Sequence, residues 1–232
     1  MKTIGLIGGM SWQSSAQYYR IVNEEVSRRL GGNHSARSLM LSVDFGEIEG
    51  LQHDGDWARL TELMVDAARS LERGGADLLL VCTNTMHLIA PDIEACIGVP
   101  LLHIVDPTAA AIQAPGLRKV GLLGTAFTME QDFYKGRLIR QFGLDVIVPD
   151  EQHRAAVHDI IYRELVAGTV LEQSRTVFRA IIARLVAHGA EAIILGCTEI
   201  MLLVEADDSA VPLFDTTTLH ALAAVDQALE DR

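Results

Sequence analysis

The residue with the clearest chemical potential in this sequence is Cys197, which directly follows the apolar run 193–195 and Gly196. This pattern predicts a buried strand, a tight turn and the first turn of a helix. A helix N-terminus lowers the pKa of a thiol below its free value of about 8.5, so Cys197 is expected to act as a base or nucleophile. A lone cysteine also packs as a small apolar residue, but Thr198 and Glu199 beside it are costly to bury without a role.

A weaker copy of this pattern lies earlier, where the apolar run 78–81 is followed by Cys82, Thr83, Asn84 and Thr85. Neighbouring residues of a strand point to opposite faces. If Thr83 faces a ligand, Cys82 therefore faces the core. Cys96, within an apolar segment, is expected to be a packing residue.

Other polar side chains follow predicted strands. Thr125 with Thr128, and Asn84 with Thr85, place donors at two expected helix N-termini, which suits a carboxylate ligand as well as ordinary capping. Gln52 lies in an expected loop after a strand. The remaining candidates are His87, which could orient a reacting group or cap a helix, and His53, Arg163 and Glu164, which could contact a substrate or lie on the surface. The Gly8-Gly9 turn lacks the later glycine and the lysine of nucleotide-binding loops.

Strands and helices alternate along the chain, and the pattern restarts near residue 119. Thr83 follows Gly8 by 75 residues, and Cys197 follows Gly124 by 73 residues. We therefore expect an α/β protein of two pseudo-symmetric, flavodoxin-like lobes with parallel sheets and the active site in the cleft between them. The expected lobes are 1–105 plus 214–232, and 106–213. The expected strands are 3–7, 39–43, 78–81, 99–106, 119–123, 145–148, 192–195 and 211–215.

Composition narrows the function classes. The chain has 232 residues and a formal net charge of −12, which argues against nucleic acid as a partner. Its three cysteines form no C-x-x-C pair, and no apolar run approaches the ~18 residues of a membrane span. We expect a cytoplasmic protein that does not act at a membrane.

Several motifs together resemble the aspartate/glutamate racemase superfamily, aspartate racemase branch. They are GLIGGMSW, SVDF, TNTMH, GLLGTAFTMEQDFY, IIYRELVAG and GCTEI, which span nearly the whole chain. The resemblance implies an amino-acid racemase that needs neither pyridoxal phosphate nor a metal, in which two cysteines act on opposite faces of the substrate. Cys197 takes the place of the second cysteine and Thr83 that of the first, so the chain is similar to an asymmetric variant. By the same resemblance the substrate-contacting residues are Met10, Gln52, Asn84, Thr85, Thr125, Glu164, Thr198 and Glu199.

Two other functions stay open at this point. A related one-cysteine enzyme could decarboxylate malonate-type acids, since one thiol suffices to protonate an enolate. A non-catalytic amino-acid binding protein would use the same two lobes. In each case the partner is a small molecule, no cofactor is expected, and the protein is expected to form a homodimer.

Overall fold

The computed structural model describes residues 1–230 and divides the chain into two compact units. Unit 1 is Met1–Ile104 with the chain from His220 onward, and unit 2 is Val105–Leu219. The sequence predicted that the chain re-enters the first lobe at residue 214, but in the structure it does so at His220. The reason is that strand β7 pairs with β6 in the sheet of unit 2. Residues 231–232 of the expected first lobe lie outside the described residues. Within residues 1–230 no helix is both long and apolar enough to cross a membrane.

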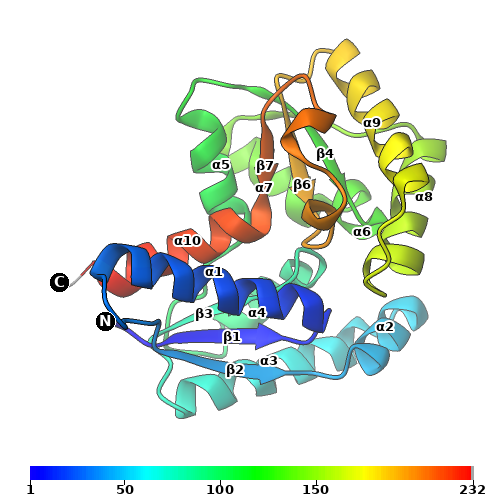
Figure 1. Ribbon diagram of the computed structural model, residues 1–232. Coiled ribbons are helices and arrows are strands. Elements are labelled where there is room, and N and C mark those ends of the chain that lie inside the picture. Colours follow the sequence, from blue (N-terminus) through cyan, green and yellow to red (C-terminus); the bar gives the residue numbers. More distant parts are fainter. Residues whose placement is uncertain (231–232) are drawn as a thin grey trace. The chain divides into compact units, whose positions relative to one another are not determined.

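Unit 1 is built on a parallel sheet with strand order β2-β1-β3, comprising β2 (Ser38–Ser42), β1 (Ile4–Gly8) and β3 (Leu78–Val81). Helix α1 (Trp12–Leu30) and the later part of α10 (Thr216–Leu229) cover one face, and α3 (Trp57–Arg73) covers the other (Figure 1). The remaining helices of the unit are short: α2 (Phe45–Asp54), the 3-10 helix η1 (Thr85–Ile89) and α4 (Ala90–Glu94). Residues 78, 80 and 82 of the β3 segment join one core cluster, and residues 79 and 81 join the other, as strand alternation requires.

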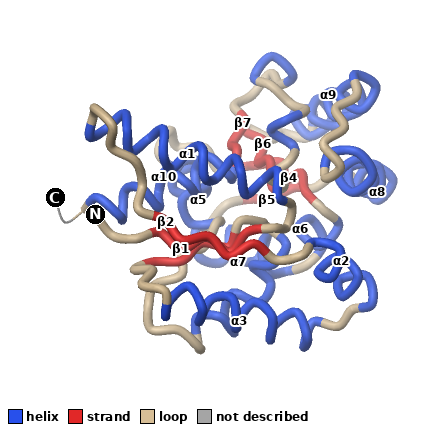
Figure 2. The backbone as a smooth tube through the Cα atoms, turned by 60° about the horizontal axis from the view of Figure 1, so that its bottom comes forward, coloured by secondary structure: helices blue, strands red, loops and turns tan. Residues whose placement is uncertain are grey.

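Unit 2 has a parallel sheet with strand order β5-β4-β6-β7. Its strands are β4 (Lys119–Gly124), β5 (Asp145–Ile147), β6 (Ala192–Gly196) and β7 (Leu213–Asp215). Helices pack on both faces of this sheet (Figure 2). They are α5 (Val105–Gln113), α6 (Ala126–Glu130), α7 (Asp132–Phe142), α8 (Glu151–Ile160), the π-helix η2 (Ile161–Leu165), α9 (Glu172–Ala187), and the 3-10 helices η3 (Ile200–Leu202) and η4 (Ala206–Asp208).

The two sheets repeat one topology, which confirms the predicted pair of parallel α/β lobes. Strands β2-β1-β3 correspond in order to β5-β4-β6, and both follow the start of the flavodoxin-like strand order. Where unit 2 adds β7, unit 1 has only an isolated bridge between Leu79 and Leu101. The predicted strand over 99–106 is therefore wrong, because pairing stops after Leu102 and α5 begins at Val105.

The predicted loop at Gln52 also differs from the structure, and two helical segments of unit 2 are irregular. The expected loop around Gln52 is the helix α2, which begins because the Asp44 side chain accepts a hydrogen bond from the Gly46 N–H. Gln131, whose backbone is extended, separates α6 from α7. Helix α8 continues with π geometry after Ile160, as η2.

Buried histidines form part of the core of unit 1. His220 donates from Nε2 to the Leu102 carbonyl at 2.8 Å, so its Nδ1 accepts from the Tyr18 hydroxyl, also at 2.8 Å. The rings of His87 and His220 lie 5.8 Å apart. Burial, followed by the charge of His87, lowers the pKa of His220 to about 3. Both ring nitrogens are engaged in the neutral form, so the folded protein resists protonation of this residue.

We expect acid to destabilise unit 1 through His220. His220 takes up a proton below about pH 6.5 in the unfolded state but only near pH 3 in the folded state. Its contribution to the free energy of unfolding is therefore fully present above pH 6.5 and decreases as the pH falls. Between pH 7 and pH 5 the loss attributable to this residue is about 2 kcal/mol. Urea unfolding at both pH values should show a smaller loss for His220→Gln. The exposed His34 supplies the control, since His34→Gln should keep the wild-type pH dependence; equal pH dependence in all three proteins would contradict the expectation.

Candidate active site

Two of the predicted site residues in unit 2 lie side by side at the carboxyl edge of its sheet. Strands β4 and β6 pair with Gly124 opposite Gly196, so the residues that follow, Thr125 and Cys197, leave the sheet at the same level. A Cβ on Gly124 would lie 2.7 Å from the Gly196 carbonyl oxygen, and a Cβ on Gly196 would lie 2.8 Å from that of Leu123. The close approach of the two strand ends therefore requires glycine at both positions.

Cys197, Thr198 and Glu199 form one hydrogen-bonded group. The Cys197 thiol donates to Glu199 Oε2 at 3.0 Å, and the Thr198 hydroxyl donates to the same oxygen at 2.8 Å. All three side chains are buried. Burial, then the Glu199 charge and its hydrogen bond, raise the pKa of Cys197 well above its ordinary value, and backbone hydrogen bonds oppose this only in part. The arrangement is a neutral thiol that donates a hydrogen bond to a carboxylate.

The expectation of a lowered pKa at Cys197 is therefore wrong, and the reason is local structure. No α-helix begins after Gly196; the chain bends and forms the three-residue 3-10 helix η3 at Ile200–Leu202. So short a helix aligns few peptide dipoles, and its effect on the thiol is small beside burial and the Glu199 carboxylate.

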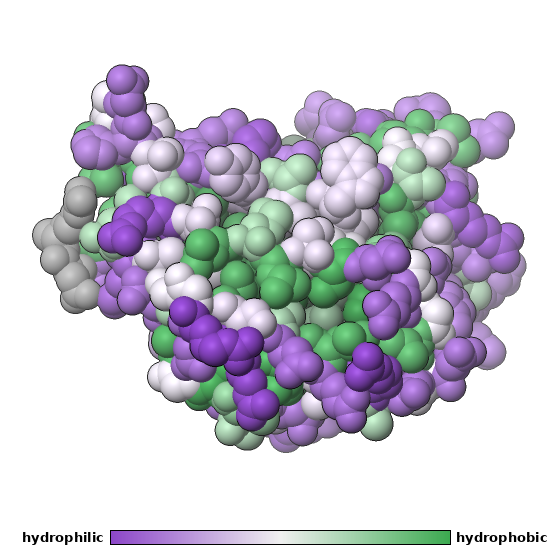
Figure 3. Space-filling model, turned by 90° about the horizontal axis from the view of Figure 1, so that it is seen from below, coloured by the Kyte–Doolittle hydropathy of each residue, from purple (hydrophilic) through white to green (hydrophobic). Residues whose placement is uncertain are grey.

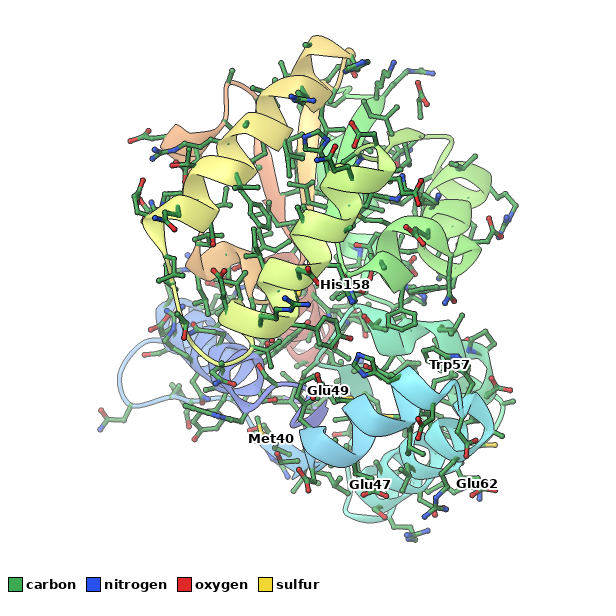
Figure 4. The ribbon with its side chains drawn as sticks, turned by 90° about the vertical axis from the view of Figure 1, so that its right-hand side faces the viewer. Met40, Glu47, Glu49, Trp57, Glu62 and His158 are labelled. Carbon is green, nitrogen blue, oxygen red and sulfur yellow. The ribbon has the colours of Figure 1, made fainter. Side chains whose placement is uncertain are left out.

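Thr125 begins α6 as its N-cap. Its Oγ1 accepts from the Thr128 N–H at 3.3 Å, which confirms the capping interpretation. His158 of α8, which the sequence analysis missed, accepts from the Ala126 N–H at 3.2 Å through Nδ1 (Figure 4). Its ring packs 4.6 Å from that of Tyr162, four residues later. The sequence signal that could have identified His158 is its spacing of four residues from Tyr162, an aromatic residue inside the motif IIYRELVAG.

Glu164 lies in the π-helix η2, which packs beside η3. Its Oε2 accepts a hydrogen bond from the Ser174 hydroxyl at 2.5 Å. The alternative candidate Arg163 is exposed and lies 3.7 Å from Asp159 on the same helix. Glu164 therefore lies on an element that packs beside η3, the short helix after Cys197, whereas Arg163 lies on the surface.

Thr83, Asn84 and Thr85 follow β3 at the corresponding edge of unit 1. Asn84 and Thr85 are buried, and Thr83 is half-buried. His87 Nδ1 donates to the Thr83 carbonyl at 2.8 Å, and its Nε2 accepts from the Ile104 N–H at 3.2 Å. His87 therefore holds the backbone of Thr83 in place, and it does not cap η1, which has no side-chain cap.

Met10 and Gln52 reach the same edge of unit 1 from the neighbouring strands. Met10 follows β1 and is buried, and Ile7 of β1 pairs with Val81 of β3. The Gln52 side chain donates to Met86 Sδ at 3.2 Å, which joins α2 to the turn that carries Thr83. The three strand-end segments of unit 1 that carry the motifs GLIGGMSW, SVDF and TNTMH thus lie at one edge of its sheet.

The other cysteines are core residues, as the sequence predicts: Cys82 from strand alternation and Cys96 from its apolar segment. Cys82 is fully buried in the core cluster with Tyr18, and burial raises the pKa of its thiol far above the ordinary value. Cys96 packs against the other cluster of unit 1. Among residues 1–230, no three His, Cys, Asp or Glu side chains are grouped closely enough to hold a metal ion.

Comparison with known proteins is consistent with this arrangement. The family described as Asp/Glu/Hydantoin racemase matches residues 7–224. The broad specificity amino-acid racemase RacX of Bacillus subtilis (strain 168) is 23% identical over 227 residues, which is 96% of each chain. A protein from Yersinia pestis, proposed to be an Asp/Glu racemase, is 55% identical, with a TM-score of 0.92 over 99% of this chain and 100% of that one. An aspartate racemase homologue from Pyrococcus horikoshii OT3 is 34% identical, with a TM-score of 0.83 over 98% of this chain and 99% of that one. The chain belongs to the Asp/Glu/hydantoin racemase family.

Proposed function

We propose that this protein is a racemase of aspartate or glutamate that uses neither pyridoxal phosphate nor a metal. The observation that carries the proposal is the Cys197 thiol hydrogen-bonded to Glu199 at the carboxyl edge of β6, in a chain of a racemase family. The proposed acid/base groups are Cys197 and Thr83, each of which directly follows a strand of a parallel sheet. The names of two relatives, a broad specificity amino-acid racemase and an aspartate racemase homologue, support an amino-acid substrate.

Cys197 acts on the face that carries the α-proton of the L-enantiomer. The resting thiol passes its proton to Glu199, and the ammonium group of a bound amino acid lowers the pKa of the thiol by its positive charge. The thiolate then removes the α-proton, so the S–H bond re-forms as the Cα–H bond breaks and the electron pair stays on the substrate as an enolate. Hydrogen-bond donors at the strand ends stabilise that charge.

Thr83 serves the opposite face. Its hydroxyl, directly or through a water, gives a proton to the α-carbon and regains one from solvent. A hydroxyl is a weaker acid than a thiol, so this delivery is the slower step. Asn84, Thr85 and Thr125 supply donors for the substrate carboxylates. A carboxylate at Glu164 would repel the side-chain carboxylate of the substrate. We therefore assign Glu164 to the ammonium group or a hydroxyl; its Oε2 already accepts a hydrogen bond from Ser174.

We expect L-aspartate or L-glutamate to lose its α-proton to heavy water faster than it racemises. Cys197 removes the proton and returns a deuteron to the same face before the slower hydroxyl delivers to the other. The D-enantiomer should show little exchange beyond its racemisation. Proton NMR measures exchange and polarimetry measures inversion. The equilibrium constant between enantiomers is one, so kcat/KM must be equal in both directions, and equal retention-exchange from both enantiomers would contradict the assignment of faces.

The cysteine variants test which thiol acts. Cys197→Ala should lower α-proton exchange by at least about 100-fold, the range of a lost general base. Cys82→Ala should keep most of it, because Cys82 lies in the core cluster of unit 1. Circular dichroism must show both variants folded. Loss of exchange in Cys82→Ala but not in Cys197→Ala would show that Cys82 is the base.

The wild-type protein tests the alternative function. Carbon dioxide release from substituted malonates would favour a decarboxylase over a racemase.

Thr83→Cys should raise exchange from the D-enantiomer and speed inversion in both directions. The new thiol is a better acid and base than the hydroxyl that it replaces. Thr83→Ser keeps a hydroxyl and is the matched control, which should leave the preference for L-side exchange intact. If Thr83→Cys and Thr83→Ser behave alike, a group other than Thr83 serves the second face.

Alkylation of Cys197 by iodoacetamide should have a pH midpoint above the ~8.5 of a free thiol. Glu199→Gln should lower that midpoint by about one pH unit, because it removes the neighbouring charge, and should speed alkylation at pH 8 about tenfold. A background of Cys82→Ala with Cys96→Ser leaves Cys197 as the only thiol. An unchanged midpoint in Glu199→Gln would show that burial alone sets the pKa.

A further inference from the structure

Among residues 1–230 three histidines are buried, and all of them belong to unit 1. Polar side chains ordinarily lie on the surface, and Figure 3 shows them in purple around a green apolar area on one face of the molecule. His87, His103 and His220 are by contrast only 1%, 5% and 0% exposed. The centroid of the His87 ring lies 4.6 Å from that of His103 and 5.8 Å from that of His220. Buried polar rings need hydrogen-bond partners, and these partners indicate what His87 and His220 hold in place.

His87 is hydrogen-bonded at both of its ring nitrogens. Nδ1 donates to the Thr83 carbonyl at 2.8 Å, and Nε2 accepts from the Ile104 N–H at 3.2 Å. A carbonyl can only accept and a backbone N–H can only donate, so the two bonds together require a neutral ring with its proton on Nδ1. Ile104 is the last residue of unit 1 before the chain passes into unit 2. One ring thus joins the turn that carries Thr83 to the segment by which the chain leaves the unit.

His220 has the opposite tautomer and holds a different part of unit 1. Its Nε2 donates to the Leu102 carbonyl, and its Nδ1 accepts from the Tyr18 hydroxyl. These bonds join α10 to α1 and to the segment after β3 and α4, and neither partner is a residue of the candidate site. His220 is therefore a buried histidine of the same cluster with which His87 can be compared.

Thr83 depends on His87 for its position. Within residues 1–230 Thr83 makes one hydrogen bond, the one that its carbonyl accepts from His87. It lies in a bend between β3 and η1, so no bond of a strand or helix fixes its backbone. The half-buried hydroxyl is left for a ligand, while the backbone that carries it is held at the carbonyl by the imidazole.

We propose that His87 is a positioning residue for Thr83 and acts as the neutral ring with its proton on Nδ1. The inference rests on the proposed function, in which the Thr83 hydroxyl serves the face of the substrate opposite to Cys197. Proton transfer requires that hydroxyl within hydrogen-bond reach of its target, and a displacement of about 1 Å can slow such a step about 100-fold. Cys197 follows a strand of the other unit and has its own hydrogen bond to Glu199, so its proton transfer does not depend on His87.

Two substitutions separate the two bonds of His87. The amide nitrogen of asparagine is as many bonds from Cβ as Nδ1 and can donate to the Thr83 carbonyl. The amide oxygen of glutamine is as many bonds from Cβ as Nε2 and can accept from the Ile104 N–H. In heavy water His87→Gln should slow inversion of the L-substrate at least about tenfold but leave its retention-exchange within about twofold of the wild type. His87→Asn should keep inversion within about threefold of the wild type.

The ratio of retention-exchange to inversion is the measurement that a purely structural role would not change. Loss of folded protein lowers both rates by the same factor, whereas a displaced Thr83 hydroxyl lowers inversion alone. His220→Gln removes an equally buried ring and is the matched control, which should be less stable but keep the wild-type ratio. Equal ratios in His87→Asn and His87→Gln, or a ratio that His220→Gln changes as much as His87→Gln does, would overturn the proposal.

NMR of protein labelled with nitrogen-15 in its histidines tests the tautomer without turnover. Couplings between the ring nitrogens and the carbon-bound ring protons show which nitrogen carries the proton, and His87→Asn and His220→Gln assign the signals. At pH 7 we expect the proton on Nδ1 of His87 and on Nε2 of His220. A proton on Nε2 of His87 would overturn the proposal even in an active racemase. A wild-type protein that exchanges no α-proton would instead contradict the proposed function, and the tautomer would still show whether His87 holds the Thr83 carbonyl.

Discussion

The parallel pairing of Gly124 with Gly196 is the contact on which the candidate site of unit 2 depends. It sets the ends of β4 and β6 at one level, so that a capping threonine and a thiol leave the sheet together. Neither glycine can be replaced without a Cβ meeting a backbone carbonyl oxygen at less than 3 Å. In unit 1, pairing of Ile7 with Val81 brings the segments of Met10 and Thr83 to the corresponding edge. The position of the chemistry thus follows from strand register.

Burial decides the chemical state of the thiols more than secondary structure does. Cys82 and Cys197 follow similar strands, and burial raises the pKa of both. Of these two cysteines, Cys197 alone has a carboxylate within hydrogen-bond distance, and its thiol donates a hydrogen bond to that carboxylate, Glu199. A thiol with a raised pKa is mostly neutral at neutral pH, and this limits its reactions with electrophiles.

Function also depends on how the two halves differ. The repeat supplies the same strand order twice, yet one copy ends in a half-buried threonine and the other in a thiol with its own carboxylate. Buried histidines support the threonine side, with His87 bonded to the Thr83 carbonyl. Cys82, the thiol next to Thr83, belongs instead to the core cluster of α1 and α10, as strand alternation predicts.

The sequence by itself determined the parallel α/β architecture, the repeat, the burial of Cys82 and the place of Cys197 after a strand. These follow from short-range patterns: alternation, apolar runs and turn residues. The tertiary structure decided what depends on distant neighbours. It replaced the helix after Gly196 by a 3-10 turn, made the Gln52 loop a helix, and reduced the strand at 99–106 to one bridge. It also brought His158 to the Thr125 turn and raised the pKa of Cys197. Such properties depend on burial and on charges from other elements, which a local pattern of residue types does not encode.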